Sequence, residues 1–240
     1  DRSGYWVDPV NRRQPQRVGV NEKVLGGALP GQIVVVVITR QPDRNNGPEG
    51  RIDAVLGDYL TPGIEVEMAI RANDLPTDFP AEALAQADDL PVRVPTSAKQ
   101  GRADLRNLPF VTIDGEDARD FDDAVYCEPV EEGFRLLVAI ADVAHYVRPG
   151  TPIDEEAQNR GTSVYFPQYV IPMLPESLSN GLCSLKEGVD RLAIVCEMTI
   201  GRRGAVRSYC FHDAVIRSHR RFTYTRVQEI LDGASDALAR

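Results

Sequence analysis

A dense acidic motif, TIDGEDARDFDDAV (112–125), lies between two apolar stretches of the chain. Six carboxylates fall within ten residues there: Asp114, Glu116, Asp117, Asp120, Asp122 and Asp123. PFVTID (109–114), which overlaps the start of the motif, and DAVYCEPV (123–130), which overlaps its end, are typical of strands. The acidic groups therefore border a core. If the backbone from Arg119 to Ala124 is extended, Asp120 and Asp122 project to one face, which Asp123 reaches only if the backbone bends.

Carboxylates that converge at such a border repel one another unless cations lie between them. Hard divalent ions prefer oxygen ligands, and two of them about 4 Å apart can bind the attacking and leaving oxygens of a phosphodiester. A solvated acidic loop is the ordinary alternative for a run of charge. A calcium loop of the EF-hand type is disfavoured, because its D-x-[DN]-x-[DN]-G spacing is absent and the flanks are strand-like.

The overall charge limits how the chain could bind nucleic acid. Its net charge is −9, which argues against binding over the whole surface. The acidity is concentrated in residues 61–132, which hold 6 basic and 17 acidic side chains. The nearly neutral flanks could bind a polyanion, and the middle could bind cations.

Targeting and redox signals favour a cytoplasmic protein. The longest aliphatic run, Ile33 to Ile38, is too short to span a bilayer, so we expect no membrane contact, and no leader peptide is evident. Because no C-x-x-C pair occurs, we expect reduced, buried cysteines at positions 127, 183, 196 and 210. The chain starts without Met and stops just after a helical pattern, so we expect a fragment of a longer protein.

The fold class expected from the patterning is α+β. In residues 1–75, GQIVVVVITR (31–40) predicts a buried strand and EGRIDAVLGD (49–58) a second. Alternation at Ile64, Val66 and Met68 indicates a third, and together these predict a small OB-like β-barrel. Residues 76–109 read as a wrapping linker with a short helix from Ala81 to Ala87.

Residues 110–240 are predicted to mix hairpins and helices. DAVYCEPV and FRLLVAIADV form one expected hairpin, and RLAIVCEMTI and AVRSYCFHDAVIRSH form another across GRRG. TPIDEEAQNRG predicts a helix between the hairpins, and TYTRVQEILDG predicts a last helix that Thr223 or Thr225 caps.

The acidic motif resembles the catalytic signature of the ribonuclease II superfamily, the exoribonucleases with an RNB domain. The likeness continues through VAIADVAHYVRPGTPIDEEAQNRGTSVYFP and IPMLPESLSNGLCSLKEGVDRLAIVCEM, and covers residues from Leu108 to Leu231. It implies that residues 110–240 are the N-terminal part of an RNB catalytic domain, truncated here. Residues 1–75 then resemble the cold-shock (OB-fold) RNA-binding domain that precedes it.

The resemblance implies processive hydrolysis of single-stranded RNA from its 3′ end to nucleoside 5′-monophosphates. It implies Mg²⁺ as the cofactor, with Mn²⁺ as a possible substitute. The metal-binding aspartates of the family fall on Asp114, Asp120, Asp122 and Asp123, with Asp122 and Asp120 catalytic and Asp122 the most critical. Tyr165 matches the tyrosine that stacks on the terminal base, although by itself it could be an ordinary core aromatic.

The chain departs from this family in extent. The later part of the RNB domain, with an arginine-rich motif that contacts the scissile phosphate, and the S1 domain that follows are missing, so we expect a monomeric fragment with weak or no activity. Two other hypotheses stay open: a non-catalytic RNA-binding OB module, and a structural domain that binds cations without nucleic acid.

Overall fold

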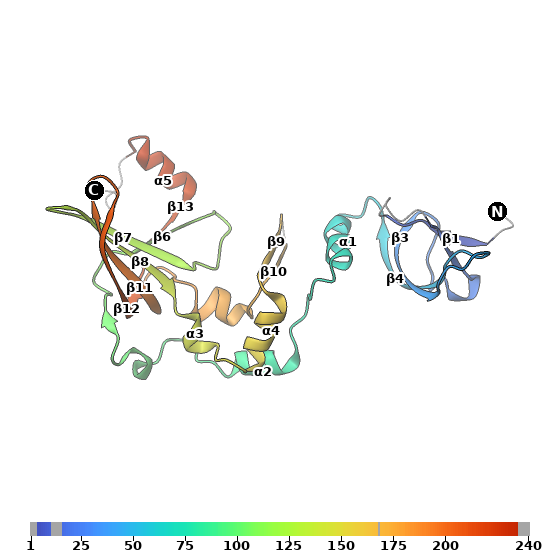
Figure 1. Cartoon of the computed structure of the whole chain (residues 1–240), viewed down its shortest axis with the longest axis horizontal. Coiled ribbons are helices and arrows are strands. Elements are labelled where there is room, and N and C mark those ends of the chain that lie inside the picture. Colours follow the sequence, from blue (N-terminus) through green and yellow to red (C-terminus); the bar gives the residue numbers. More distant parts are fainter. Residues whose placement is uncertain (1–3, 11–15, 168, 235–240) are drawn as a thin grey trace. The chain divides into compact units, whose positions relative to one another are not determined.

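The computed structural model describes residues 4–10, 16–167 and 169–234 (Figure 1). It divides into two compact units, residues 1–75 and 76–240. Strands form the bulk of the first unit, and a larger sheet with helices forms the second. The predicted α+β class, with an OB-like unit before a mixed domain, is confirmed.

The first unit is built on a four-stranded sheet in the order β1-β2-β4-β3. Its elements are β1 (Tyr5–Val7), β2 (Val18–Val20), η1 (Glu22–Val24), β3 (Gln32–Arg40), β4 (Glu49–Asp58) and α1 (Ile64–Ala72). The long β3 and β4 pair antiparallel, and β2 pairs parallel with β4. Position 50 of β4 requires glycine, because a Cβ there would lie only 2.8 Å from Val37 O.

Two expectations for this unit were wrong. The strand at 31–40 was expected to be buried, but β3 contains no buried residue, and Val37 and Ile38 are each 40% exposed. The cause is its place at the edge of the sheet, where only one neighbouring strand covers it.

The expected third strand is instead the helix α1. The sequence IEVEMAIRA is rich in strong helix formers, and its apolar residues also fit helical i, i+4 pairs, Ile64 with Met68 and Val66 with Ile70. An i, i+4 ion pair joins Arg71 Nε to Glu67 Oε1 at 2.8 Å. Three alternating residues could not distinguish the two periodicities, and the local helical pairs decided it.

The second unit is organised around a seven-stranded sheet in the order β13-β6-β7-β8-β11-β12-β5. Its strands are β5 (Ala103–Asp104), β6 (Val111–Asp114), β7 (Asp123–Val130), β8 (Gly133–Ala141), β11 (Asp190–Gly201), β12 (Val206–Arg217) and β13 (Arg220–Thr223). A separate hairpin comprises β9 (Val164–Phe166) and β10 (Tyr169–Ile171). The helical elements are α2 (Ala81–Asp88), η2 (Thr96–Lys99), α3 (Val143–Tyr146), α4 (Pro152–Arg160), η3 (Leu178–Leu182) and α5 (Tyr224–Leu231).

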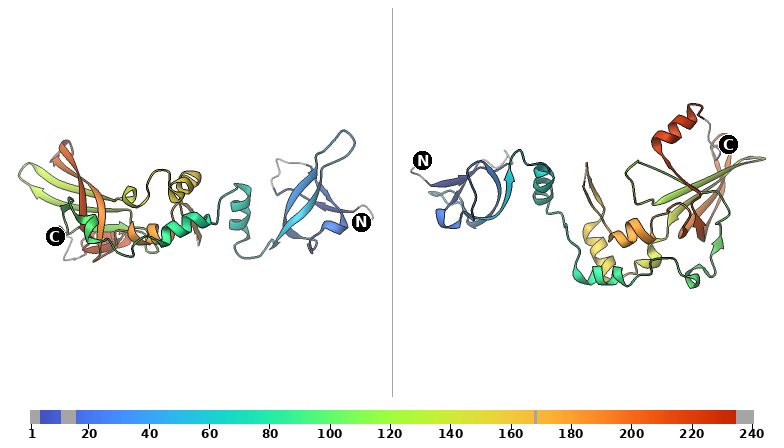
Figure 2. Two further views of the ribbon diagram at one scale, coloured as in Figure 1. Left: turned by 90° about the horizontal axis from the view of Figure 1, so that it is seen from below. Right: turned by 180° about the vertical axis from the view of Figure 1, so that it is seen from behind.

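The predicted hairpins and helices of this unit are confirmed. β7 pairs with β8, and β11 with β12, both antiparallel. Thr223 caps α5, since its hydroxyl accepts a hydrogen bond from Arg226 N. Figure 2 shows α2 and α4 close together in both views, and the two helices are in contact. The helix predicted at 81–87 is therefore part of the second unit and packs against α4.

The core of the second unit is formed mainly by one face of the large sheet and the helices and loops that cover it, and it also includes Leu192 and Val215 from the opposite face. Phe110, Leu137, Val195 and Ile216 are almost completely buried in it. Along the strands, successive side chains alternate between this face and the opposite one. Asp123, the first residue of β7, is exposed, and the next residue, Ala124, is buried. The carboxylate of Asp123 therefore lies at the border of the core.

The cysteines are all free, but the expectation that they are buried was only partly right. Cys183 is buried and Cys196 is half-buried, whereas Cys127 and Cys210 are exposed. Cys127 lies on the face of β7 opposite the buried Ala124, whereas Cys210 lies on the core-side face of β12 but beyond the last buried residue of that face, Ala214. Among the described residues, no helix is both long and apolar enough to cross a membrane.

Candidate active site

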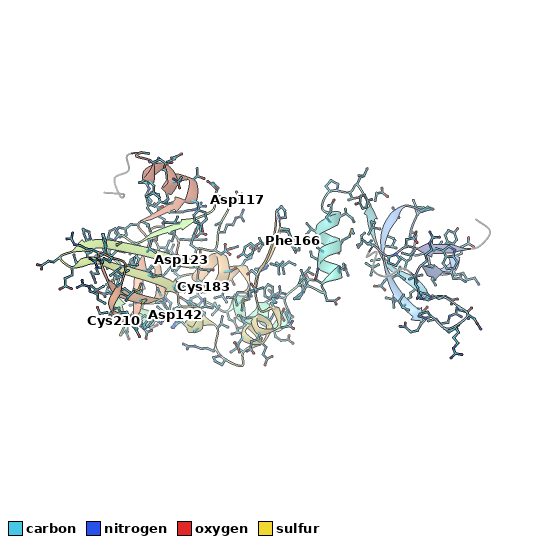
Figure 3. The ribbon with its side chains drawn as sticks, turned by 45° about the horizontal axis from the view of Figure 1, so that its top comes forward. Asp117, Asp123, Asp142, Phe166, Cys183 and Cys210 are labelled. Carbon is cyan, nitrogen blue, oxygen red and sulfur yellow. The ribbon has the colours of Figure 1, made fainter. Side chains whose placement is uncertain are left out.

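The four predicted aspartates line a single cavity in the second unit. Asp114 ends β6, and Asp120 and Asp122 lie in the irregular segment that follows. Asp123, labelled in Figure 3, begins β7. The cavity has a volume of about 1040 Å³, and Tyr165 from β9 lines it as well. The predicted site residues are therefore brought together from three strands and one loop.

The segment that carries Asp120 and Asp122 is not the extended strand that the sequence suggested. Phe121 between them is buried in the core, so its two neighbours are directed away from the core and toward the cavity. Asp123 is close enough to raise the pKa of both Asp114 and Asp122. Asp123 lines the same cavity as Asp122, although the two are neighbours in the chain.

Backbone hydrogen bonds anchor this irregular segment on both sides. Ser184 Oγ donates to Arg119 O at 2.7 Å and accepts from Phe121 N at 3.1 Å. Leu185 N donates to Phe121 O at 2.8 Å, and Ala141 N donates to Asp122 O at 2.9 Å. Because Ser184 is fully buried, water does not compete for these bonds, and the direction of the two aspartates is well determined.

The carboxylates oppose one another electrostatically. Burial raises the pKa of Asp114, and the charges of Asp123 and Asp120 raise it further. Burial likewise raises the pKa of Asp122, followed by the charges of Asp120, Asp114 and Asp123. Such shifts are expected where anions share a site, and a bound divalent cation would reverse them.

A basic residue that the sequence did not single out holds the turn between β6 and β7. Arg221 of β13 donates from Nη2 to Gly115 O at 2.8 Å and to Glu116 O at 2.6 Å. Thr225 Oγ1 donates to Glu116 Oε1 at 2.6 Å, and this bond lowers the pKa of Glu116. Glu116 therefore belongs to the support of the turn, and the parallel pairing of β13 with β6 makes that contact possible.

Tyr165 is presented to the cavity as an open aromatic surface. Its side chain is 64% exposed, which excludes the ordinary core role that was the alternative for it. Its hydroxyl donates to Asp120 Oδ2 at 2.8 Å. Partial burial raises the pKa of Tyr165, and the bond to Asp120 adds to the rise, so the ring stays neutral and fixed beside the carboxylates.

The donor set fits a hard divalent ion such as Mg²⁺ better than a soft one. The ligands on offer are carboxylate oxygens, and their mutual repulsion is the observation that a cation would relieve. Cys183 lies near Asp122, but burial raises the pKa of its thiol to about 12, so it is not a thiolate ligand.

The four aspartates do not form a tight cage. Within the part of the chain that the structure describes, three ligand atoms from His, Cys, Asp or Glu lie within 4.8 Å of one another only at Glu197, Cys210 and His212. Mg²⁺ keeps several waters in its coordination shell, so aspartates that bind partly through water suit it at the wider spacing.

Two family models match the chain. The RNB domain model matches residues 102–240, which include the whole candidate site, and the cold shock domain model matches residues 6–80. The first match covers more than half of the chain.

Curated relatives match nearly the full length of this chain. Ribonuclease R of Escherichia coli is 56% identical over 232 residues, which are 96% of this chain and 28% of the relative. Ribonuclease R of Vibrio cholerae is 53% identical over the same shares, and that of Acidithiobacillus ferrooxidans is 51% identical over 100% of this chain and 55% of the relative. These are the bacterial enzymes that the form GEDARDFDDAV of the acidic motif most resembles. The chain spans between about a quarter and about half of their length.

Solved structures with the same fold include both an RNA complex and a pseudonuclease. Mycoplasma genitalium RNase R in complex with double-stranded RNA has a TM-score of 0.87 and 32% identity, over 97% of this chain and 43% of that one. Yeast Ssd1, a pseudonuclease, has a TM-score of 0.75 and 18% identity, over 97% of this chain and 30% of that one. The second likeness shows the fold alone, so activity has to be argued from the site residues.

Proposed function

Because the chain belongs to the RNB domain family, we propose that it supplies the metal-binding part of an exoribonuclease active site. The reaction is hydrolysis of single-stranded RNA from its 3′ end to nucleoside 5′-monophosphates, in a processive manner. The observation that carries this proposal is the convergence of Asp114, Asp120, Asp122 and Asp123 on one cavity with an exposed tyrosine.

The aspartates have distinct proposed roles. Asp114, Asp120 and Asp123 bind Mg²⁺ directly or through water, with Mn²⁺ as a substitute, and Asp122 is the residue most critical for cleavage. When bound, the metal supplies an activated water and charge stabilisation at the phosphodiester. The raised pKa of Asp122 supports this assignment, because perturbed carboxylates in a cavity are typical of functional sites.

Tyr165 positions the 3′ end of the RNA. We propose that the terminal base stacks on its exposed ring, while its hydroxyl keeps Asp120 in place. Stacking on an aromatic ring accepts any base and contributes about 1–3 kcal/mol per base, which suits an enzyme that degrades RNA without regard to sequence.

The activity of a whole protein requires segments outside this chain. We propose that the remaining part of the RNB domain and an S1 domain complete the site and the RNA path, and that the chain alone is weakly active or inactive. We also propose a monomer that works in the cytoplasm, where four free cysteines stay reduced.

A chimera tests this function directly. The described chain replaces the matched 232-residue segment of Escherichia coli ribonuclease R, and the product is incubated with 3′-labelled and 5′-labelled RNA in Mg²⁺. We expect mononucleotides from the 3′ end, no cleavage in EDTA, and RNA binding without cleavage for Asp122→Asn. Normal turnover of the Asp122→Asn chimera would refute the role of Asp122, and release of the 5′ label first would refute the polarity.

A non-catalytic RNA-binding module is the second candidate function. The match of residues 6–80 to the cold shock domain model and the exposed aromatic residues Tyr5 and Trp6 of β1 favour it. In that case the chain binds single-stranded RNA equally well with and without EDTA, Trp6→Ala weakens the binding, and the chimera does not degrade RNA.

A further inference from the structure

A second group of potential metal ligands lies on the β11–β12 hairpin, apart from the aspartates. Glu197 of β11 pairs directly with Cys210 of β12, and His212 follows two residues later on the same face. Strands β8 and β11 separate β12 from β7, which begins with Asp123, and Figure 3 labels Cys210 well away from that residue.

The three side chains converge on one point. His212 Nε2 lies 3.2 Å from Cys210 Sγ and 3.0 Å from Glu197 Oε2. All three atoms lie within 4.8 Å of one another. Each of them can donate an electron pair, and thiolate, imidazole and carboxylate together are a zinc-type ligand set, with expected bond lengths of about 2.0–2.3 Å.

A single proton on His212 Nε2 can satisfy only one of its two contacts fully. If Nε2 carries a proton, it can donate fully to Glu197 or to Cys210, but not to both. If Nε2 is unprotonated, its lone pair faces the carboxylate at 3.0 Å, which is repulsive. A cation at the common point would accept all three electron pairs at once.

The surroundings hold the carboxylate in position and keep it ionised. Arg135 of β8 donates from Nε to Glu197 Oε1 at 2.7 Å and from Nη1 to Glu128 Oε1 at 2.9 Å. The hydrogen bond from Arg135 lowers the pKa of Glu197 and leaves Oε2 directed at His212. With Cys210 as a thiolate, the two glutamates and Arg135 give a net charge of about −2, which a divalent ion neutralises.

The site is open to solvent on one side. Among the described strands, β5 covers the outer edge of β12 at Ala214 and Val215 and none covers it at Cys210 and His212. Cys210 is exposed. An ion could enter there and keep a water molecule as its fourth ligand.

We propose that Glu197, Cys210 and His212 form a binding site for a thiophilic divalent cation of the zinc type, separate from the proposed Mg²⁺ site. Oxygen-only ligands at the aspartates select hard ions, whereas the thiolate and imidazole select Zn²⁺ over Mg²⁺. The site does not depend on the proposed nuclease function.

Cobalt titration of the 240-residue chain tests the site. The chain is stripped with chelator, reduced and kept in excess Mg²⁺ to occupy the aspartates, and Co²⁺ is added as a spectroscopic probe. We expect a thiolate-to-cobalt charge-transfer band in the near ultraviolet that saturates at one equivalent and disappears when Zn²⁺ is added. Carboxylate ligation at the aspartates produces no such band, so the two sites are distinguished.

Two serine variants provide the matched comparison. Cys210→Ser should abolish the band, whereas Cys127→Ser should keep it, because Cys127 is also exposed but lies on the other face of the sheet from Glu128 and Glu197. His212→Gln keeps the thiol but removes a proposed ligand. It should weaken Zn²⁺ binding by at least about 10–100-fold, because removal of a group that only orients a metal ligand already has an effect of that size.

Protection of the thiol provides an independent readout. Zn²⁺ should slow alkylation of Cys210, followed by mass spectrometry, and leave alkylation of Cys127 unchanged. Absence of a charge-transfer band in the unmodified chain, or a band that persists in Cys210→Ser, would overturn the proposal and leave only a hydrogen-bonded surface cluster.

Discussion

Ser184 is the residue whose loss should most clearly disturb the candidate site without touching a carboxylate. In Ser184→Ala, the Phe121 N–H and the Arg119 carbonyl lose their partner in a place that water does not reach. Each unsatisfied buried group costs about 1–3 kcal/mol, and two neighbouring losses are not simply additive. We therefore expect a local destabilisation of about 1–3 kcal/mol.

Hydrogen exchange measures this loss where it occurs. The amides of Leu185 and Ala141 donate to Phe121 O and Asp122 O, so their exchange reports opening of the segment that carries Asp120 and Asp122. A loss of about 1–3 kcal/mol accelerates their exchange roughly 5- to 150-fold. Because the segment carries two of the proposed metal ligands, Mg²⁺ affinity should also fall about 10–100-fold.

Ser179→Ala is the matched control. Ser179 Oγ makes only long contacts, 3.5 Å to Leu174 O and 3.4 Å to Pro175 O, so its removal should change stability by less than about 0.5 kcal/mol. Trp6, the single tryptophan, lies in the other unit, and its fluorescence should be the same in both variants. Exchange of Leu185 and Ala141 within about twofold of the unmodified chain in Ser184→Ala would refute the anchoring role.

Three further predictions concern charge and stacking. In chelator near neutral pH, Asp122→Asn should raise the melting temperature, because the folded protein holds the ionised Asp122 carboxylate at a cost. The pKa of Asp122 is raised, so the stability that its carboxyl contributes is complete below the ordinary pKa of 3.8 and is lost as the pH rises through the pKa of the folded state. The gain should vanish in melts recorded below that ordinary value, and Mg²⁺ should stabilise the unmodified chain more than the variant. Burial favours a higher pKa for Asp190, but hydrogen bonds from Lys99 and Arg217 lower this pKa from 3.8 to about 2. Asp190→Asn should therefore lower the free energy of unfolding, measured in urea at neutral pH, by about 2 kcal/mol. That cost should be lost as the pH falls from 3.8 to about 2, and equal stabilities at neutral pH would contradict the assignment. Tyr165→Ala should weaken binding of short single-stranded RNA to the chimera by about 1–3 kcal/mol while Tyr165→Phe keeps it, and equal affinities would exclude stacking on Tyr165.

Local patterning predicted most elements of the second unit. The hairpins β7–β8 and β11–β12 follow from short turns between strand-like runs, and α5 begins at its expected cap, Thr223. The acidic motif between two strands also predicted the position of the candidate site, because clustered carboxylates next to buried residues repel one another unless they bind cations. Local patterning was wrong for α1, where strand and helix periodicities coincide over a few residues, and for the exposure of β3, which depends on its place in the sheet.

By itself, the sequence determined which side chains are carboxylates at a strand end and which segments form hairpins, because both depend on neighbours a few residues away. The tertiary structure decided what holds those carboxylates. Ser184 and Arg221 reach the acidic segment from 63 and 106 residues away, and local patterning does not reveal contacts across such separations. The facing of Glu197 with Cys210 and His212 likewise follows from the register of two strands, which backbone pairing sets only once the sheet has formed.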